Sequence, residues 1–463
     1  MSRTVRPDPA SFRDPSGRVY EVDGRIFRTV HPPARKDYEF VRSTGCLDRL
    51  IERDLVISAE EVSPHLLAEA GADACYVLEH PRLPFISYPF EWSFPGLKAA
   101  AVLTLDVHLA VLEHGITLSD SSAYNVQFVG PKPLFIDYLS FRRYRDGEFW
   151  SGHRQFCEQF LNPLLLTAMT GVPFHSWYRG AIEGITATEL ASLIPLRRRV
   201  SWNVIMHVMM QARYSKPGAA DTASRLSQRK LPLAALQRML KSLRSWVSRL
   251  EPSESRQTIW EGYSAAEGYR GEEKRSKHEF VREFTGSTQP NVLLDLGCNT
   301  GEYAEIAIAA GAESAIGLES DHGALDAAFK RSVARGLPFL PLYTDVANPS
   351  PGGGWLGHER SRLMSRIKAD AVLALALVHH MAIGRNVPLE RVVEWIVSLA
   401  PTGIIEFVPK ADPMVQALLR LREDVFEQYS VGVFLDSIRR SAQVVKEREI
   451  TESGRLLVWF ERK

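Results

Sequence analysis

An acid and two glycines follow a short apolar run near the start of the last third of the chain. Residues 292–294 are β-branched and aliphatic, which suits a strand buried on both faces, and Asp295 comes next. Gly297 and Gly301 then lead into an alanine-rich run with helical spacing. Glycines in a strand-to-helix turn let the main chain approach a ligand closely. The segment therefore predicts a turn that binds a nucleoside-type ligand.

The spacing of this turn narrows the choice of ligand. The pattern Asp-x-Gly-x-x-x-Gly differs from the Gly-x-Gly-x-x-Gly of dinucleotide sites, and the Lys-Ser/Thr pair of a P-loop is missing. A pyrophosphate is disfavoured, and a ligand with an amino-acid end and a nucleoside end, such as S-adenosylmethionine (SAM), remains. The alternative is an ordinary glycine turn, because short glycine motifs have many false positives.

Two more acids close the next strand-like runs. Glu319 ends the run that begins at Ser314, at roughly the twenty-residue interval at which a second-strand carboxylate binds ribose hydroxyls in doubly wound folds. Asp345 ends a third run, which begins at Phe339. Strand, acid and helix thus alternate along this part of the chain.

The remaining runs complete the predicted sheet. A fourth run spans 370–378 and a fifth spans 404–408, and the chain closes with 443–446 and 455–460 on either side of a Glu-Ser-Gly turn. Alternating strands and helices followed by a hairpin favour an α/β fold, with a parallel sheet and an antiparallel edge.

Two histidines follow the fourth run, at the strand ends where doubly wound folds bind their ligands. Because the SAM sulfonium makes its methyl group electrophilic, the protein need only align an acceptor and remove its proton. His380, and after it His379, is the candidate general base, and the alternative is that both only shape the pocket. Glu406 and Asp412, beyond the fifth run, are predicted to orient the acceptor.

With these motifs in this order, residues 258–463 resemble a class I SAM-dependent methyltransferase. The narrower segments 345–349, 406–414 and 422–424 resemble a bacterial family of two-part proteins, some of them nodulation-associated methyltransferases. The resemblance implies a Rossmann-like, seven-stranded sheet with an antiparallel terminal hairpin, and it places Asp345 on the adenine side. The residues expected to hold SAM are Tyr263, Tyr269, Lys277, Asp295, Gly297, Cys298, Asn299, Gly301, Glu319 and Asp345.

Among these, Tyr263, Tyr269 and Lys277 resemble the aromatic and basic leader that lies over the SAM site in related enzymes. The alternative is that they pack the domain entrance. The Asn/Asp-Pro-Pro-Tyr/Phe signature is absent after the fourth run, which argues against adenine or glutamine N-methylation. The predicted acceptor is a small molecule.

The first half contains a second constellation. Asp120 and Asn125 have the spacing of the kinase catalytic loop, in which the Asp accepts the substrate proton and the Asn holds magnesium. Asp137 follows after one hairpin, where kinases place their other magnesium-binding Asp. Three oxygen ligands suit a hard cation carried by nucleotide phosphates.

Residues 16–190 therefore resemble a divergent protein-kinase or aminoglycoside-phosphotransferase domain, which implies an α+β fold and Mg-ATP as a candidate second cofactor. The sequence departs from that pattern: Leu118 replaces the usual His, Tyr-Leu follows Asp137, and Arg28 stands in for the phosphate-binding Lys. A degenerate nucleotide-binding module is favoured over an active kinase. The alternative is a polar hairpin with local turn chemistry.

Between Pro195 and Leu250 there are twelve Lys or Arg against one Asp. The run 233–250 has leucines along one face, which predicts a basic amphipathic helix. A helix that docks on one domain is favoured over an RNA or membrane contact, since no aromatic-interleaved RNA-binding motif accompanies the charge. The predicted parts are a kinase-like domain at 1–190, a basic helical connector at 191–257 and a methyltransferase domain at 258–463.

The cysteines and histidines predict neither a disulfide framework nor a metal site. The four cysteines contain no CxxC pair, and Cys298 is expected to be a reduced packing residue. His153, His175 and His207 have no partners at metal-ligand spacing along the sequence. The start of the chain has no apolar signal region, and the run 97–112 is interrupted by charge, so we expect a cytoplasmic protein without a membrane span.

The leading hypothesis is a SAM-dependent methyltransferase with a kinase-like module that binds nucleotide or substrate or acts as a scaffold. The alternatives are a bifunctional kinase and methyltransferase, an RNA methyltransferase that uses the basic connector, and a noncatalytic SAM-binding scaffold. The sequence predicts no oligomeric state.

Overall fold

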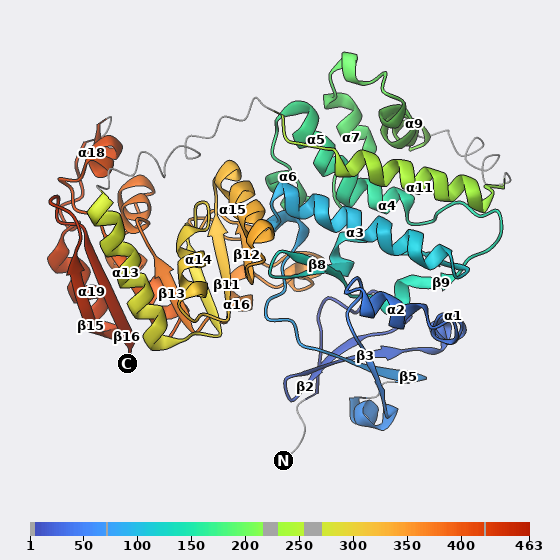
Figure 1. Cartoon of the computed structure of the whole chain (residues 1–463), viewed down its shortest axis with the longest axis horizontal. Helices are drawn as coiled ribbons and strands as arrows, with labels where there is room; N and C mark the ends of the chain where they lie inside the picture. Colours follow the sequence, from blue (N-terminus) through green and yellow to red (C-terminus); the bar gives the residue numbers. More distant parts are fainter. Residues whose placement is uncertain (1–4, 71–72, 216–229, 254–270, 421–422) are drawn as a thin grey trace. The chain divides into compact units, whose positions relative to one another are not determined.

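The computed structural model describes residues 5–70, 73–215, 230–253, 271–420 and 423–463. The chain divides into two compact units (Figure 1). Unit 1 comprises Met1–Arg256 and Pro351–Arg362, and unit 2 comprises Gln257–Ser350 and Leu363–Lys463. Each unit has its own buried apolar cluster, around Phe27 and Val77 in unit 1 and around Phe284 and Leu373 in unit 2. The predicted boundaries at 190 and 257 stay a prediction.

Unit 2 is built on a seven-stranded sheet. Its order is β12 (Phe339–Tyr343), β11 (Ser314–Glu319), β10 (Val292–Leu296), β13 (Ala371–Ala374), β14 (Thr402–Phe407), β16 (Leu456–Arg462) and β15 (Ala442–Glu449). The first five strands run parallel, and β16 and β15 pair antiparallel. The predicted parallel sheet with an antiparallel terminal hairpin is confirmed.

Helices connect and cover these strands. They are α13 (Gly271–Thr288), α14 (Glu302–Ala309), α15 (His322–Arg335), α16 (Leu363–Arg366), α17 (Leu389–Leu399), α18 (Pro413–Leu419) and α19 (Val431–Ser441). Acidic side chains start two of them: Asp321 accepts from two amides at the start of α15, and Asp412 accepts from the Met414 amide of α18. Such caps satisfy amides that have no partner inside the helix. They fix where each helix leaves the strand ends.

Unit 1 begins with a five-stranded antiparallel sheet. Its order is β1 (Val5–Pro7), β2 (Val19–Val22), β3 (Arg25–Val30), β5 (Tyr76–His80) and β4 (Glu60–Val62). Helices α1 (Arg35–Ser43) and α2 (Cys46–Glu52) stand between β3 and β4 in the chain. Two small sheets follow, which pair β6 (Ile116–Leu118) with β9 (Phe141–Arg143) and β7 (Val126–Val129) with β8 (Lys132–Phe135). The predicted resemblance of residues 16–190 to a kinase domain stays a prediction.

The rest of unit 1 is helical. It contains α3 (Phe94–Leu112), α4 (His153–Phe156), a π-helix (Cys157–Leu161), α5 (Asn162–Thr170), α6 (His175–Gly180), α7 (Ala187–Leu193), α8 (Trp202–Val204), a second π-helix (Ile205–Met209), α9 (Met210–Tyr214) and α11 (Leu233–Ser248). Helix α3 is long and apolar enough to cross a membrane, but 61% of its most apolar window is buried inside the protein, as in a core helix.

Helix α11 is the predicted basic amphipathic helix. Leu236, Leu240, Leu243 and Val247 are its buried face, and it packs along α3 (Figure 1). The Arg244 guanidinium also forms a two-pronged ion pair with Asp106 of α3, with one N–O distance of 2.9 Å. The helix therefore docks within unit 1, in agreement with the prediction that it packs on one domain.

Residues 351–362 belong to unit 1, although the chain on both sides of them belongs to unit 2. Arg13 donates two hydrogen bonds, of 2.8 and 3.0 Å, to the buried Glu359 carboxylate. The Ser361 amide donates to the Tyr88 hydroxyl at 2.9 Å, and the Arg360 guanidinium lies over the Tyr124 ring. Ion pairing and aromatic contacts thus hold this segment in unit 1.

Candidate functional site

A cavity of about 350 Å³ opens at the carboxyl ends of β10, β11, β12 and β13. Ligand pockets in proteins are typically roughly 300–1,000 Å³, so this volume suits a small molecule. Eight of the residues predicted from the sequence line it: Lys277, Asp295, Gly297, Cys298, Asn299, Glu319, Asp345 and His380. Parallel strands bring their carboxyl ends to one edge, which is why acids far apart in the chain meet here.

The glycine turn between β10 and α14 forms one wall. Gly297 and Gly301 have φ of 70° and 79°, a left-handed conformation that favours glycine. The amides of Gly297 and Cys298 donate to the Leu318 carbonyl at 2.8 and 3.1 Å. A Cβ on Gly301 would lie 2.6 Å from the Phe339 ring. Side chains are thus excluded from Gly301, and the turn is held against β11.

The Glu319 carboxylate, at the end of β11, is hydrogen-bonded to this turn. It accepts hydrogen bonds from the amides of Asn299 at 2.8 Å and of Ser320 and Asp321 at 2.7 Å each. Burial raises the pKa of Glu319, although these amides oppose the shift. The predicted ribose acid therefore also ties the end of β11 to the turn after β10.

Asp295 is a buried acid with an unused acceptor. Its side chain is 2% exposed, and Oδ2 has no hydrogen-bond partner among the described residues. Burial, and after it the negative charge of Glu319, raises the pKa of Asp295 to about 7. A buried carboxylate oxygen without a donor is costly. The arrangement suits a ligand that brings a donor or a positive charge.

This raised pKa predicts a pH-dependent effect of Asp295→Asn. The folded protein holds the Asp295 proton more tightly than the unfolded chain, whose pKa is near 3.8. The stability contributed by this proton is therefore full below about pH 4 and is lost as the pH rises to about 7. Asn cannot ionise, so the ligand-free variant should be more stable than wild type at pH 8, by a few kcal/mol at about 1.36 kcal/mol per pKa unit.

Thermal unfolding of both proteins at several pH values measures this effect. The advantage of Asp295→Asn should be nearly constant between pH 8 and about pH 7 and should shrink from there to pH 5. A stability difference that is constant across this range would contradict the assignment.

A buried ion pair adjoins the cavity through Lys277, which is one of the lining residues. Lys277 of α13 donates to Glu406 of β14 at 2.7 Å, and both side chains are at most 1% exposed. The Ala376 amide donates to the same Glu406 oxygen at 2.8 Å. Arg455 lies 3.6 Å from the other Glu406 oxygen and donates to Asp412 at 2.7 Å. Glu406 and Asp412 are thus held in a charge network, and their predicted role with the acceptor stays a prediction.

The two histidines have different surroundings. His379 is fully buried, and neither ring nitrogen has a hydrogen-bond partner in the described part of the chain. His380 lines the cavity from a π-helix (His380–Gly384). Burial lowers the pKa of His380 to about 4 and that of His379 well below its usual value. Both rings are therefore neutral near pH 7, and the geometry favours His380 over His379 as the group that meets a ligand.

Sequence reasoning missed several lining residues, among them Tyr303 and Arg385. Tyr303 follows the glycine turn by two residues, and the Lys277 ammonium lies 4.9 Å from its ring centre. Arg385 pairs with Asp345 at 3.1 Å at the rim. The position of Tyr303 in the first turn of the helix after the glycine turn could have identified it as a lining residue. No comparable sequence pattern marks Arg385. The predicted Tyr263 and Tyr269 lie outside the described residues.

The second constellation also comes together, in unit 1. Arg28 of β3 pairs with Asp137 at 2.8 Å and with Asp14 at 2.9 Å. The Ser140 hydroxyl donates to the Asp137 carboxylate and accepts from the Asn125 side-chain amide, so it links Asp137 to Asn125. Asp120 is exposed and accepts from the Ser122 amide at 2.9 Å, a local turn contact. Asp137 is thus held between a cation and a hydroxyl.

The sheet order, the antiparallel terminal hairpin and the glycine turn define an α/β unit with a ligand cavity at its strand ends. Over 455 residues the chain is 44% identical to the nodulation protein NoeA of Rhizobium meliloti (strain 1021). The alignment covers 98% of this chain and 95% of that protein. The chain therefore belongs to the NoeA family. No protein-family model matches it.

Solved structures of methyltransferases align with part of the chain. Magnesium protoporphyrin IX methyltransferase (ChlM) from Synechocystis PCC 6803, with bound S-adenosylhomocysteine (SAH), is 16% identical, and the alignment covers 41% of this chain and 84% of that chain, with a TM-score of 0.31. The N-methyltransferase NodS from Bradyrhizobium japonicum WM9, in complex with SAH, is 12% identical over 41% of this chain and 87% of that chain, also with a TM-score of 0.31.

Proposed function

We propose that the chain is a SAM-dependent methyltransferase whose unit 2 binds SAM in the cavity at the strand ends and transfers its methyl group to a small-molecule acceptor. The observation that carries this proposal is the convergence of Asp295, Glu319 and Asp345 on one cavity beside the Gly297 and Gly301 turn. SAM carries an ammonium, a sulfonium and a ribose diol. Each of these groups suits a carboxylate partner.

The contacts of the lining residues support specific roles. Asp295 Oδ2, buried without a donor, suits the ammonium of SAM. Glu319 suits the ribose hydroxyls, and Asp345 with Arg385 suits the adenine side. The bound SAM would supply an electrophilic methyl group. The chain itself would orient the acceptor and exclude water, and His380 would accept its proton where the acceptor must lose one.

The relative supports a biological setting. NoeA is named a nodulation protein, and the match extends over nearly the whole length of both chains. We therefore place the acceptor among the small molecules that take part in nodulation. A noncatalytic SAM-binding scaffold and an RNA methyltransferase remain the alternatives to be tested.

Incubation of the purified chain with methyl-labelled SAM and cell extract tests the proposal. We expect a labelled small molecule that mass spectrometry can identify, and no label with Gly301→Val, in which the new side chain meets Phe339. Label in RNA would favour RNA methylation. Tight SAM binding without any labelled product would favour the scaffold.

A second candidate activity is nucleotide binding in unit 1. It is favoured by the position of Asp137, which faces Arg28 of β3 and is linked through Ser140 to Asn125. An arginine and an acid at one site could hold phosphates and magnesium, respectively. If unit 1 also transfers phosphate, turnover of Mg-ATP should be abolished by Asp120→Asn and unaffected by Gly297→Arg. Turnover that survives Asp120→Asn would contradict a phosphotransfer role for Asp120, and a wild-type protein that binds no Mg-ATP would contradict nucleotide binding.

A further inference from the structure

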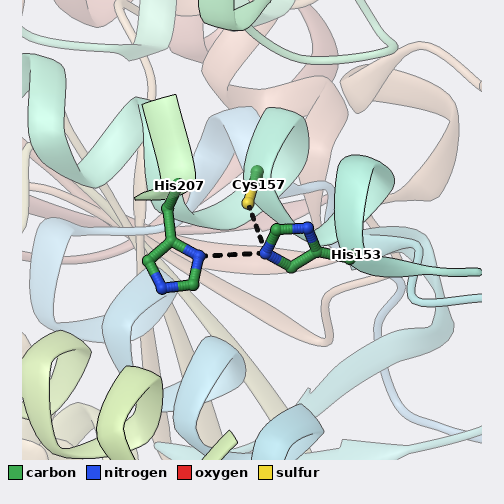
Figure 2. A group of neighbouring side chains, drawn as sticks. All are labelled: His153, Cys157 and His207. Carbon is green, nitrogen blue, oxygen red and sulfur yellow. Dashed lines mark hydrogen bonds between the residues drawn. The ribbon is translucent and has the colours of Figure 1, made fainter. Parts of the chain in front are cut away.

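Two histidines and a cysteine of unit 1 form a cluster that the sequence analysis did not expect. His153 Nε2 lies 2.9 Å from His207 Nδ1 and 3.7 Å from Cys157 Sγ (Figure 2). One candidate ligand atom from each residue lies within 4.8 Å of the other two. The prediction that His153 and His207 have no partners of metal-ligating type was wrong: His153 and Cys157 are only four residues apart, and His207 joins them through tertiary packing.

We propose that this cluster is a transition-metal site that binds Zn²⁺ through His153 Nε2, Cys157 Sγ and His207 Nδ1. Imidazole nitrogen and thiolate sulfur are the ligands that Zn²⁺ takes in proteins. Zn–N distances near 2.0 Å and Zn–S distances near 2.3 Å put tetrahedral ligand atoms roughly 3.3–3.6 Å apart. Cys157 Sγ lies at nearly that distance from His153 Nε2, and the two ring nitrogens need to separate by a few tenths of an ångström. The three candidate ligand atoms lie within 4.8 Å of one another, so metal binding would draw the sulfur and His207 toward a common centre.

The backbone presents these side chains in a regular way. His153 and Cys157 are four residues apart across α4 and the π-helix that follows it, so they lie on one helix face. His207 lies in the second π-helix, and Gln211 follows four residues later in α9. π-turns are rare and are frequent at functional sites. Here both segments that contribute ligands contain one.

Neighbouring side chains prepare the ligands. Gln211 Nε2 donates to Cys157 Sγ at 3.1 Å, and this contact opposes the effect of burial, which raises the pKa of the thiol to about 12. Metal binding would displace the Cys157 proton to solvent, and the resulting thiolate would offset one of the two positive charges.

Aromatic rings shield the cluster. The Trp150 ring lies 5.7 Å from the His153 ring, and Trp246 of α11 stacks on His207 at 6.1 Å. The surroundings therefore limit access of water and fix the orientation of both imidazoles. A metal ion here would join the segments that carry His153 and His207 and would stiffen the ring contact to α11. Its expected role is to stabilise the helical part of unit 1.

Titration of the metal-stripped, full-length protein with Zn²⁺ against a chromophoric chelator tests the proposal. We expect about one tightly bound ion per chain and a higher melting temperature with Zn²⁺ present. Since loss of an outer-shell partner alone costs roughly 10–100-fold in affinity, Cys157→Ser should cost at least about 100-fold. Cys75→Ser, which changes a cysteine outside the cluster, should bind Zn²⁺ like wild type.

Co²⁺ provides an independent readout that does not depend on the stability of a variant. The wild-type protein should show a thiolate-to-cobalt charge-transfer band, and the band should persist in Cys75→Ser and vanish in Cys157→Ser. His207→Gln serves as a second variant if Cys157→Ser does not fold. A wild-type protein that binds no Zn²⁺, or Zn²⁺ binding unchanged in the folded Cys157→Ser or His207→Gln variant, would overturn the assignment.

Discussion

Replacing Glu319 with alanine is expected to lower the affinity for SAM by at least about 100-fold, or roughly 3 kcal/mol. The Glu319 carboxylate accepts from three backbone amides, of Asn299, Ser320 and Asp321. Each hydrogen bond to a charged group contributes about 1.5–3 kcal/mol, and the proposed ribose contacts would be lost as well. The variant should lose both the shape of the turn and its partner for the ribose.

Equilibrium dialysis with labelled SAM measures this loss. Glu313→Ala is the matched control, because Glu313 is an exposed glutamate just before the same strand. It should bind SAM like wild type. An affinity for SAM that Glu319→Ala leaves unchanged would mean that the carboxylate does not organise the site.

Lys277→Met should destabilise unit 2 by about 3 kcal/mol, near the lower end of the usual cost of removing one partner of a buried ion pair, because Arg455 still lies 3.6 Å from Glu406 in this variant. Lys277 and Glu406 are 1% and 0% exposed, so water cannot replace the lost ammonium. The double variant Lys277→Met, Glu406→Gln removes both charges and should regain much of the loss. Arg455 would keep its ion pair with Asp412 in that variant.

Urea unfolding, followed by a probe in unit 2, measures the free energy of unfolding of each variant. Lys274→Met on the same helix is the control, since Lys274 forms a partly exposed pair with Glu302. Such pairs contribute roughly 0–1 kcal/mol. Equal losses for Lys274→Met and Lys277→Met, or no recovery in the double variant, would contradict a special role for the buried pair.

The parts of unit 2 that depend on local sequence could be predicted. The run at β10 is apolar and short, and the glycines after it need left-handed angles, so strand, turn and helix follow from adjacent residues. Glu319 and Asp345 reach the cavity because parallel strands end at one edge. The alternation of strands and helices, the antiparallel edge and the acid positions were therefore accessible from the sequence.

Contacts between distant residues could not be predicted in this way. Lys277 and Glu406 are 129 residues apart, and no local pattern marks them as partners. His207 meets His153 only because two helical segments pack together in unit 1. Residues 351–362 look like an ordinary loop between strand runs, yet Glu359 is buried in unit 1 by Arg13. Such pairings arise from tertiary packing, which periodicity does not record.

Calorimetric titration of the purified chain with SAH, the product form of the cofactor, tests the central claim most directly. The account predicts saturable binding of about one SAH per chain, retained in Asp120→Asn of unit 1 and lost in Gly301→Val, where a side chain would meet the Phe339 ring. An absence of binding by the folded wild-type protein at millimolar SAH, or binding that Gly301→Val leaves unchanged, would contradict it.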